Sequence, residues 1–203
     1  METHTILVRP MREPDVPEVV AIHCKAFRGF FLDLMGKPFL SRYYRLVIGF
    51  PKSIAIIAES NEGGIRGFAV GFCDDVGFYR HMKSHWFVLA PSVILALIRN
   101  PLLLRKVLYS RLRVGRMSRG FRDPLSVELA SIAADAKGGG VGSALLKAFA
   151  REARAMGGRT ISLTTDLEDN AMTLSFYRKH GFVQTGTEMR DGRPMGTLEL
   201  NLI

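Results

Sequence analysis

The feature that most constrains this sequence is a run of glycines between a strand pattern and an amphipathic helix pattern. Leu125 to Ala134 is typical of a strand, Lys137-Gly-Gly-Gly-Val-Gly142 of a tight turn, and the stretch to about Met156 of a helix. Glycines let the backbone approach an anion closely, and the free N–H groups and dipole of a helix N-terminus attract it. The run therefore predicts a phosphate site made of backbone, with a plain tight turn as the alternative. It lacks the Gly-Lys-Ser/Thr of a nucleoside-triphosphate loop and the third glycine of a dinucleotide fingerprint.

The remaining patterns predict further helices and strands on both sides of this turn. Asp15 and Glu18 have the spacing of a capping box, in which two side chains satisfy backbone N–H groups at the start of a helix. The other expected elements are a strand at 5–10, a helix from Asp15 to about Phe27, a helix from about Lys37 to Phe50, a hairpin at 53–72, a strand at 160–164, a helix from Asn170 to His180 and a closing hairpin at 182–202.

The charge of the chain is concentrated in one segment. The 203 residues are the length of one domain, or of one domain with an insertion, and the net charge is +9. Residues 80–122, which we call the basic segment, hold ten Lys or Arg and no Asp or Glu, leaving 18 basic against 19 acidic residues elsewhere. We expect the basic segment to form two helices, broken at Pro91 and at Asn100-Pro101. Its cations are Arg80, Lys83, Arg99, Arg105, Lys106, Arg111, Arg113, Arg116, Arg119 and Arg122.

Three roles for the basic segment stay open on the sequence. They are a solvated helical lid, a surface for a phosphorylated acceptor such as a nucleotide sugar, and a contact with an anionic membrane through Trp86, Phe87 and neighbouring leucines. Nucleic acid is the least favoured partner, because no pattern of stacking aromatic and basic residues recurs. The longest apolar run, Trp86 to Ile98, has 13 residues, fewer than the roughly 20 that span a membrane. Without a secretory signal pattern, and with only Cys24 and Cys73, the sequence predicts a cytoplasmic protein with reduced thiols and no metal site.

A second motif follows the glycine turn. It is Asn170-Ala-Met-Thr-Leu-Ser-Phe-Tyr177-Arg-Lys-His-Gly181-Phe182, in which Asn170 caps a helix and Gly181 ends it. Tyr177 comes seven residues after Asn170, about two helical turns, so the two residues project on the same side. Taken alone, the motif is also explained by an amphipathic helix with a core tyrosine.

Together the two motifs resemble the GNAT superfamily of N-acetyltransferases. That family carries Arg/Gln-x-x-Gly-x-Gly/Ala between a strand and a helix, and then Asn-x-x-Ala-x-x-x-Tyr-x-x-x-Gly-Phe further along the chain. The opening Val8-Arg9-Pro10 and the hairpin at 53–72 look similar too, so the resemblance covers nearly the whole chain except the basic segment. This chain departs from the pattern at Lys137, which keeps the charge of arginine without its planar fork, and at Thr173, where the family has alanine.

The resemblance implies an α/β fold: a mixed, strongly twisted sheet of about seven strands with helices on both faces. It implies one acetyltransferase domain over residues 1–203, with the basic segment as a helical insertion at about 80–122. A V-shaped gap is expected where the strand ending near Ala134 separates from the strand at 160–164. Acetyl-CoA would enter it as co-substrate, its pyrophosphate on the glycine turn, its pantetheine arm along the strand edge and its sulfur near Tyr177. The implied binding residues are Ile132, Ala133, Ala134, Lys137, Gly138, Gly139, Gly140, Val141, Gly142, Ser143, Asn170 and Tyr177.

The resemblance also implies the reaction, which transfers an acetyl group to a primary amine. Tyr177 would protonate the leaving thiolate as general acid, and Glu128, on the strand beside the acetyl group, would be the base. A water relay, or a Glu128 that simply faces solvent, is the alternative, and His23 is a second candidate that packing also explains. The expected acceptor is an amino sugar or another anionic small molecule.

Several points of function stay open on the sequence. A non-catalytic module that binds acyl-CoA or anionic lipid is the competing interpretation of the chain. An acyl donor longer than acetyl stays open, as does a homodimer.

Overall fold

The computed structural model describes residues 6–61, 63–101, 123, 125–135, 139–190 and 192–203. Seven strands form one sheet in the order β1-β2-β3-β4-β5-β7-β6. Neighbours are antiparallel except for the central pair β4 and β5, which is parallel. This confirms the expected mixed sheet. The strands are β1 (Ile6–Pro10), β2 (Ser53–Ser60), β3 (Ile65–Phe72), β4 (Ser126–Ala134), β5 (Thr160–Asp166), β6 (Val183–Arg190) and β7 (Arg193–Asn201).

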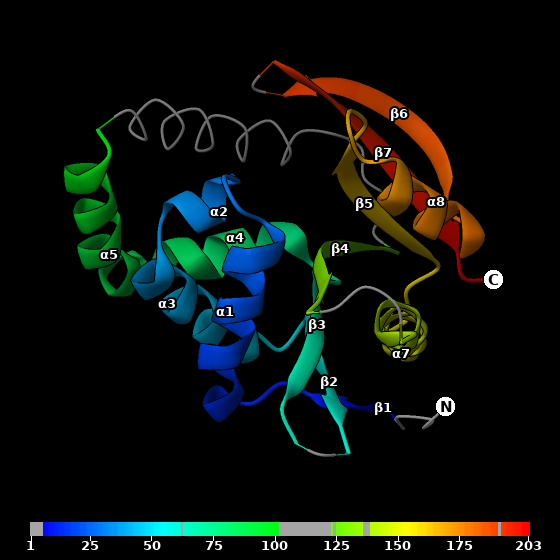
Figure 1. Ribbon diagram of the computed structural model, residues 1–203, viewed down its shortest axis with the longest axis horizontal. Coiled ribbons are helices and arrows are strands. Elements are labelled where there is room, and N and C mark those ends of the chain that lie inside the picture. Colours follow the sequence, from blue (N-terminus) through cyan, green and yellow to red (C-terminus); the bar gives the residue numbers. More distant parts are fainter. Residues whose placement is uncertain (1–5, 62, 102–122, 124, 136–138, 191) are drawn as a thin grey trace.

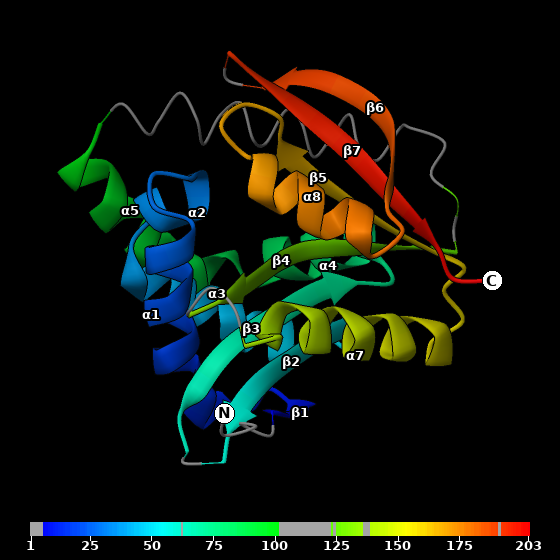
Figure 2. The ribbon, with the colours of Figure 1, turned by 45° about the vertical axis from the view of Figure 1, so that its right-hand side comes forward.

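Helices cover both faces of the sheet, as expected (Figure 1 and Figure 2). One apolar core joins α1, α3, α4 and α5 to side chains such as Ile57 and Phe68 on one face. The other joins α7 and α8 to side chains such as Ile56 and Val127 on the opposite face. The helices are η1 (Glu13–Asp15), α1 (Val16–Ala26), α2 (Phe31–Leu34), α3 (Lys37–Ile48), α4 (Asp75–Ser84), α5 (Trp86–Arg99), α7 (Val141–Ala155) and α8 (Ala171–Lys179).

The expected capping box at the start of α1 is wrong. The Asp15 carboxylate accepts hydrogen bonds from Arg9 Nη1 and Nη2, at 2.8 and 2.9 Å, and from the Arg12 N–H at 2.7 Å. Glu18 instead accepts from the Ile65 N–H on β3, 3.0 Å away. The bonds to the Arg9 guanidinium join two charged groups, whereas a cap joins the carboxylate to neutral N–H groups, and Arg9 also holds the pKa of Asp15 below its usual value. Both acidic side chains therefore join the first helix to the sheet.

The expected break at Pro91 is wrong as well. Pro91 lies inside α5, and the chain turns before this helix begins, at His85 between α4 and α5. Proline removes one helical hydrogen bond, but the helix continues because Leu89 and Ala96, on either side of it, are buried in the core. The expected end at Asn100 is confirmed. No single described helix is long and apolar enough to cross a membrane; only α4 and α5 together meet the length and composition, across a bend of 81°.

The central strands pair over a short distance and then separate, as expected. β4 and β5 are in register only from Ser126 with Thr160 to Glu128 with Ser162, although both strands continue. Ala130 is an extra residue in β4, because Val70 of β3 pairs with Ser131 while Gly71 pairs with Leu129. A bulge bends and twists its strand, which turns β4 away from β5 (Figure 2). Gly71 permits the close approach, since a Cβ there would lie 2.1 Å from the Glu128 carbonyl oxygen.

Candidate active site

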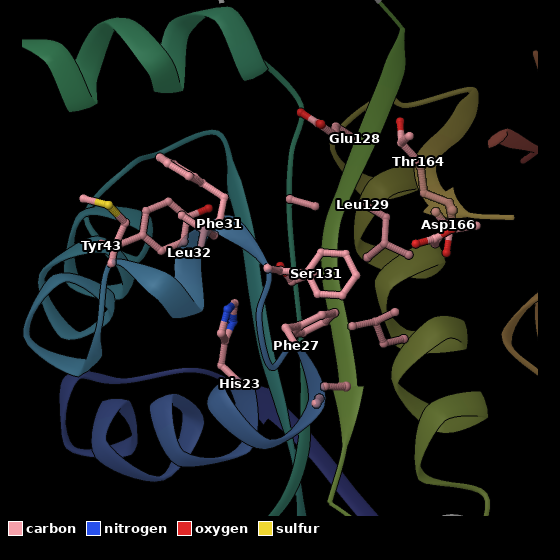
Figure 3. Close-up of a pocket in the computed structure, with 18 of the residues that line it drawn as sticks. His23, Phe27, Phe31, Leu32, Tyr43, Glu128, Leu129, Ser131, Thr164 and Asp166 are labelled. Atoms are coloured by element: carbon pink, nitrogen blue, oxygen red, sulfur yellow. The ribbon is translucent and has the colours of Figure 1, made fainter. Parts of the chain in front are cut away.

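A cavity of about 1370 Å³ opens where β4 and β5 separate. Its sheet wall consists of lining residues from β4, β5 and α8, and its helical wall consists of lining residues from the α1–α3 region, α4 and α5. Figure 3 shows His23 and Tyr43 on the helical side, and Thr164 and Asp166 on the β5 side. The cavity brings together six of the residues predicted for the site: Glu128, Ile132, Ala133, Ala134, Asn170 and Tyr177.

The glycine turn lies at the end of β4 and starts α7. Lys137 and Gly138 lie outside the described residues, and none of the described turn residues from 139 to 143 lines the cavity itself. Gly140 stands at the N-cap position of α7 with φ +73°, a conformation that favours glycine. A Cβ at Gly140 would meet nothing within 4 Å, so open space lies in front of the turn. The first N–H groups of α7, from Val141 to Ser143, have no acceptor within the helix, because the helix begins at these residues.

Asn170 holds the start of α8 against the end of β5. It occupies the N-cap position, as predicted, but its side chain makes no capping bond to the helix. Its amide nitrogen donates instead to Thr165 Oγ1 at 2.9 Å and to the Asp166 carbonyl at 2.8 Å. Both amide hydrogens are thus used within the protein, and the side-chain carbonyl is the group left for a ligand.

Tyr177 reaches the same cavity from the middle of α8. It is buried among aromatic rings, 5.4 Å from Phe176 and 5.3 Å from Phe182 between centroids. Burial raises the pKa of Tyr177 above its usual value, so the hydroxyl is protonated at neutral pH. Among the described residues no side chain or backbone group is hydrogen-bonded to this hydroxyl. Within this part of the chain, the hydroxyl has its proton available for a hydrogen bond to a ligand.

Glu128 is the last residue of β4 that pairs with β5, at the point where these two strands begin to separate. Its side chain lines the cavity, one carboxylate oxygen is buried, and Figure 3 shows it pointing away from Thr164 of β5. Burial, together with Tyr79 and Glu128, holds the pKa of Tyr43 above its usual value, which places these three groups in one electrostatic environment. Glu128 therefore faces the cavity rather than bulk solvent.

His23 is packed into the core and also lines the cavity on its helical side. Only 2% of the residue is exposed, and its ring lies 4.8 Å from Phe27 and 6.2 Å from Phe68 between centroids. Nδ1 is 2.7 Å from Tyr44 Oη, and no partner for Nε2 lies among the described residues. Burial lowers the pKa of His23 to about 4, so the ring is neutral at pH 7. These contacts favour packing over a role as base.

The helical wall is the part of the site that sequence reasoning missed. The run of Phe, Tyr and Leu from Phe30 to Phe50 indicated a helix, but nothing in it indicated which rings face a cavity. The wall joins that run to residues of β3, α4 and α5, and such contacts between distant segments have no local signal. Its larger apolar and aromatic members are Ile22, Phe27, Phe30, Phe31, Leu32, Met35, Phe39, Tyr43, Phe72, Tyr79, Met82, Trp86, Leu89, Val93 and Ile94.

Charged side chains also line the cavity, near the β6–β7 hairpin. Arg193 donates to Asp166 at 3.3 Å, and Arg190 pairs with Glu188. Arg190, Arg193 and Asp166 all line the cavity. Within the described part of the chain, no three His, Cys, Asp or Glu side chains form a group that could hold a metal ion.

Comparisons with known proteins agree with this architecture. The model of the acetyltransferase (GNAT) family matches residues 117–182, which include the glycine turn and the whole Asn170–Phe182 motif. An N-acetyltransferase from Staphylococcus aureus Mu50 shares 18% identity, with a TM-score of 0.62 over 98% of this chain and 99% of that one. A ribosomal-protein-alanine N-acetyltransferase from Brucella melitensis shares 18%, with a TM-score of 0.60 over 96% and 99%. At these identities the two structures show a shared fold, and no curated protein matches the chain.

Proposed function

Since the chain belongs to the acetyltransferase (GNAT) family, we propose that it transfers the acetyl group of acetyl-CoA to a primary amine of a small acceptor. The separation of β4 from β5 is the observation that carries this proposal. Among the described residues, it leaves one edge of β4 without a strand partner beyond Glu128, and that edge leads toward the glycine turn. We take residues 1–203, with the basic segment, as one acetyltransferase domain.

The described residues fit an extended, phosphate-bearing co-substrate. The open space in front of Gly140 allows a pyrophosphate to approach the first N–H groups of α7, where the helix dipole favours negative charge. The free edge of β4 at Ile132 to Ala134 offers backbone hydrogen bonds to an amide-containing arm, in the manner of an added strand. The Asn170 side-chain carbonyl would contact the same arm. Lys137 and Gly138, outside the described residues, complete the proposed binding set with Gly139 and Val141 to Ser143.

The chemistry assigned to the chain is movement of two protons. The acceptor amine must lose a proton as its nitrogen attacks the acetyl carbon, and Glu128 would take it, directly or through a water molecule. The bond from carbon to sulfur then breaks, and the Tyr177 hydroxyl would give its proton to the departing thiolate. General acid–base steps of this kind contribute about 10²–10⁴-fold each. A backbone N–H of β4 beside the bulge would stabilise the oxyanion.

The acceptor is the finer part of the proposal. The net charge of +9 supports an anionic acceptor, such as an amino sugar that carries a phosphate, because it attracts negative charge. Four neighbouring cations of the basic segment, Arg105, Lys106, Arg111 and Arg113, lie outside the described residues. The aromatic helical wall gives apolar contact area next to the reacting groups, so acyl donors longer than acetyl belong in the same test.

Release of CoA, measured with amine panels and with acyl-CoA of increasing chain length, tests the function. The panel contains amino sugars, nucleotide amino sugars, polyamines and peptides, and we expect turnover with an anionic amine and acetyl-CoA. Binding of acetyl-CoA without CoA release from any amine would identify the chain as a non-catalytic module. Spermine as the best substrate would contradict the anionic acceptor.

The role of Glu128 has its own test. Glu128→Gln is expected to lower kcat/KM about 100-fold and to remove the acidic limb of its pH profile. Glu152→Gln on α7, outside the cavity, is the matched control and should leave both unchanged. A Glu128→Gln profile parallel to that of the parent would assign the proton to water.

A further inference from the structure

Helix α5 is apolar on all sides, yet half of it faces water. Its inner side is buried in the core through Leu89, Ser92 and Ala96. Its outer side leaves Trp86 64%, Phe87 62%, Ile94 57%, Leu95 37% and Ile98 72% exposed. Positions 87, 91, 94 and 98 follow the spacing of one helical face. We call Trp86, Phe87, Pro91, Ile94, Leu95 and Ile98 the α5 face.

An exposed apolar surface of this kind marks an interaction site. Scattered exposed apolar residues are normal, but neighbouring large side chains on one helix form a continuous patch. Figure 1 shows α5 as the outermost helix of its layer, at the end of the molecule opposite the C-terminus. The exposed apolar side chains of α5 therefore lie on the outside of the molecule as well as beside the cavity.

The surroundings of the α5 face carry positive charge. Arg80 and Lys83 on α4 and Arg99 at the end of α5 are exposed, and the described residues give none of them an ion-pair partner. From residue 80 to residue 101, the described part of the basic segment, these three are the basic residues and there is no acidic one. A partner of the α5 face thus meets apolar side chains and a cationic border together.

We propose that the α5 face docks on an anionic lipid membrane surface. Tryptophan, phenylalanine and isoleucine side chains enter the boundary between headgroups and acyl chains, while Lys and Arg remain at the phosphates. A second copy of the chain fits less well, because a two-fold interface would bring the same cations face to face. Docking goes beyond the proposed acetyl transfer and does not depend on it.

The position of the α5 face links docking to the cavity. Trp86 and Ile94 belong to the α5 face and also line the cavity. Docking would therefore bring the edge of the helical wall close to the lipid surface. An amine held at that surface would reach the cavity along the side of α5.

The chain contains its own probe, because Trp86 is its single tryptophan. The full chain is mixed with vesicles of phosphatidylglycerol and phosphatidylcholine, or of phosphatidylcholine alone, and both sedimentation and tryptophan emission are measured. We expect binding to the anionic vesicles only, a shift of Trp86 emission to shorter wavelength, and reversal of both at high salt. Absence of binding to anionic vesicles, or binding without a Trp86 shift, would overturn the docking proposal.

Two double variants distinguish binding through the α5 face from nonspecific binding through any exposed apolar side chain. Phe87→Ser with Ile98→Ser removes two members of the face that do not line the cavity, and we expect vesicle partition to fall at least about tenfold. Leu7→Ser with Val183→Ser removes comparably exposed side chains, 59% and 65%, on β1 and β6, and should bind like the parent. Equal binding of both double variants would contradict the proposal.

The oligomeric state tests the alternative occupant of the α5 face, a second copy of the chain. A parent dimer that Phe87→Ser with Ile98→Ser converts to monomer, without vesicle binding, would show that the face holds a second copy and that membrane docking is wrong. CoA release with soluble amines is measured in parallel. A parent chain that releases CoA normally but does not bind anionic vesicles refutes docking alone. A parent chain that binds anionic vesicles but releases no CoA refutes acetyl transfer alone.

Discussion

The two walls of the cavity are built from different parts of the chain. The sheet wall offers a free strand edge, with a glycine turn just beyond it, and one tyrosine from α8. The helical wall offers side chains from α1 through α5, many of them aromatic. Backbone groups are the same in every sequence, so they suit a ligand that does not vary. Side chains can be substituted, so a wall made of them can be adapted to a particular ligand. This difference is why we propose the sheet wall for the co-substrate and the helical wall for the acceptor.

The largest effect is expected at the glycine turn. Gly140→Asp forces a side chain into a backbone conformation with φ +73° and puts a carboxylate where a pyrophosphate would approach. Isothermal titration should show acetyl-CoA affinity reduced at least about 100-fold, or abolished. Gly157→Asp at the other end of α7, with φ +86° and equally open space, is the control for strain alone. Equal affinity of the two variants for acetyl-CoA would show that the glycine turn does not bind its pyrophosphate.

The next effect concerns the core beneath the helical wall. His23 has a pKa of about 4 in the fold against 6.5 unfolded, so the unfolded chain binds more protons between these values. Its contribution to stability is complete above pH 6.5 and is lost as pH falls to 4, by about 3 kcal/mol. Urea unfolding of the parent and of His23→Gln is compared at each pH. Carboxylates titrate in both proteins, so the contribution of His23 is the difference between the two free energies of unfolding, which should shrink as pH falls from 6.5 to 4. Parallel curves would mean that the ring is not buried neutral.

A smaller effect is expected at Tyr177 of the sheet wall. Tyr177→Phe keeps the ring packed against Phe176 and Phe182 and removes only the proton, so turnover should fall about tenfold while the Kd for acetyl-CoA stays the same. Tyr44→Phe is the matched control, because its hydroxyl contacts His23 in the core and does not line the cavity. Its expected loss is in stability, not in kcat. Unchanged turnover of Tyr177→Phe would remove the hydroxyl from the reaction.

The smallest effect tests what joins the two walls. Lys25 of α1 bonds Asp135, just past the end of β4, at 2.7 Å, but about two thirds of the lysine side chain is exposed. Exposed pairs contribute roughly 0–1 kcal/mol, so Lys25→Ala should lower the free energy of unfolding by less than about 1 kcal/mol. Chemical denaturation measures this directly. A loss of several kcal/mol would mean that this pair, rather than the apolar core, holds α1 to the sheet.

Local sequence was sufficient for much of the sheet wall. The strand, turn and helix around Gly140 and the N-cap position of Asn170 follow from contiguous residues and their periodicity. The gap beside Ala134 was expected from the resemblance to the GNAT superfamily. Expectations failed where a distant partner decides. Glu18 bonds a strand that lies far along the chain instead of closing a capping box, and α5 continues through Pro91 because it packs on the core. The helical wall could not be predicted for the same reason.

Hydrogen exchange with and without acetyl-CoA tests the central claim, that the free edge of β4 and the start of α7 hold the co-substrate. Saturating acetyl-CoA is predicted to slow exchange in peptides covering residues 129–135 and 139–146. Peptides of the β1–β2 pair, whose backbone groups already bond each other, should not change. Protection confined to other elements, or none at a concentration where titration shows binding, would contradict the account.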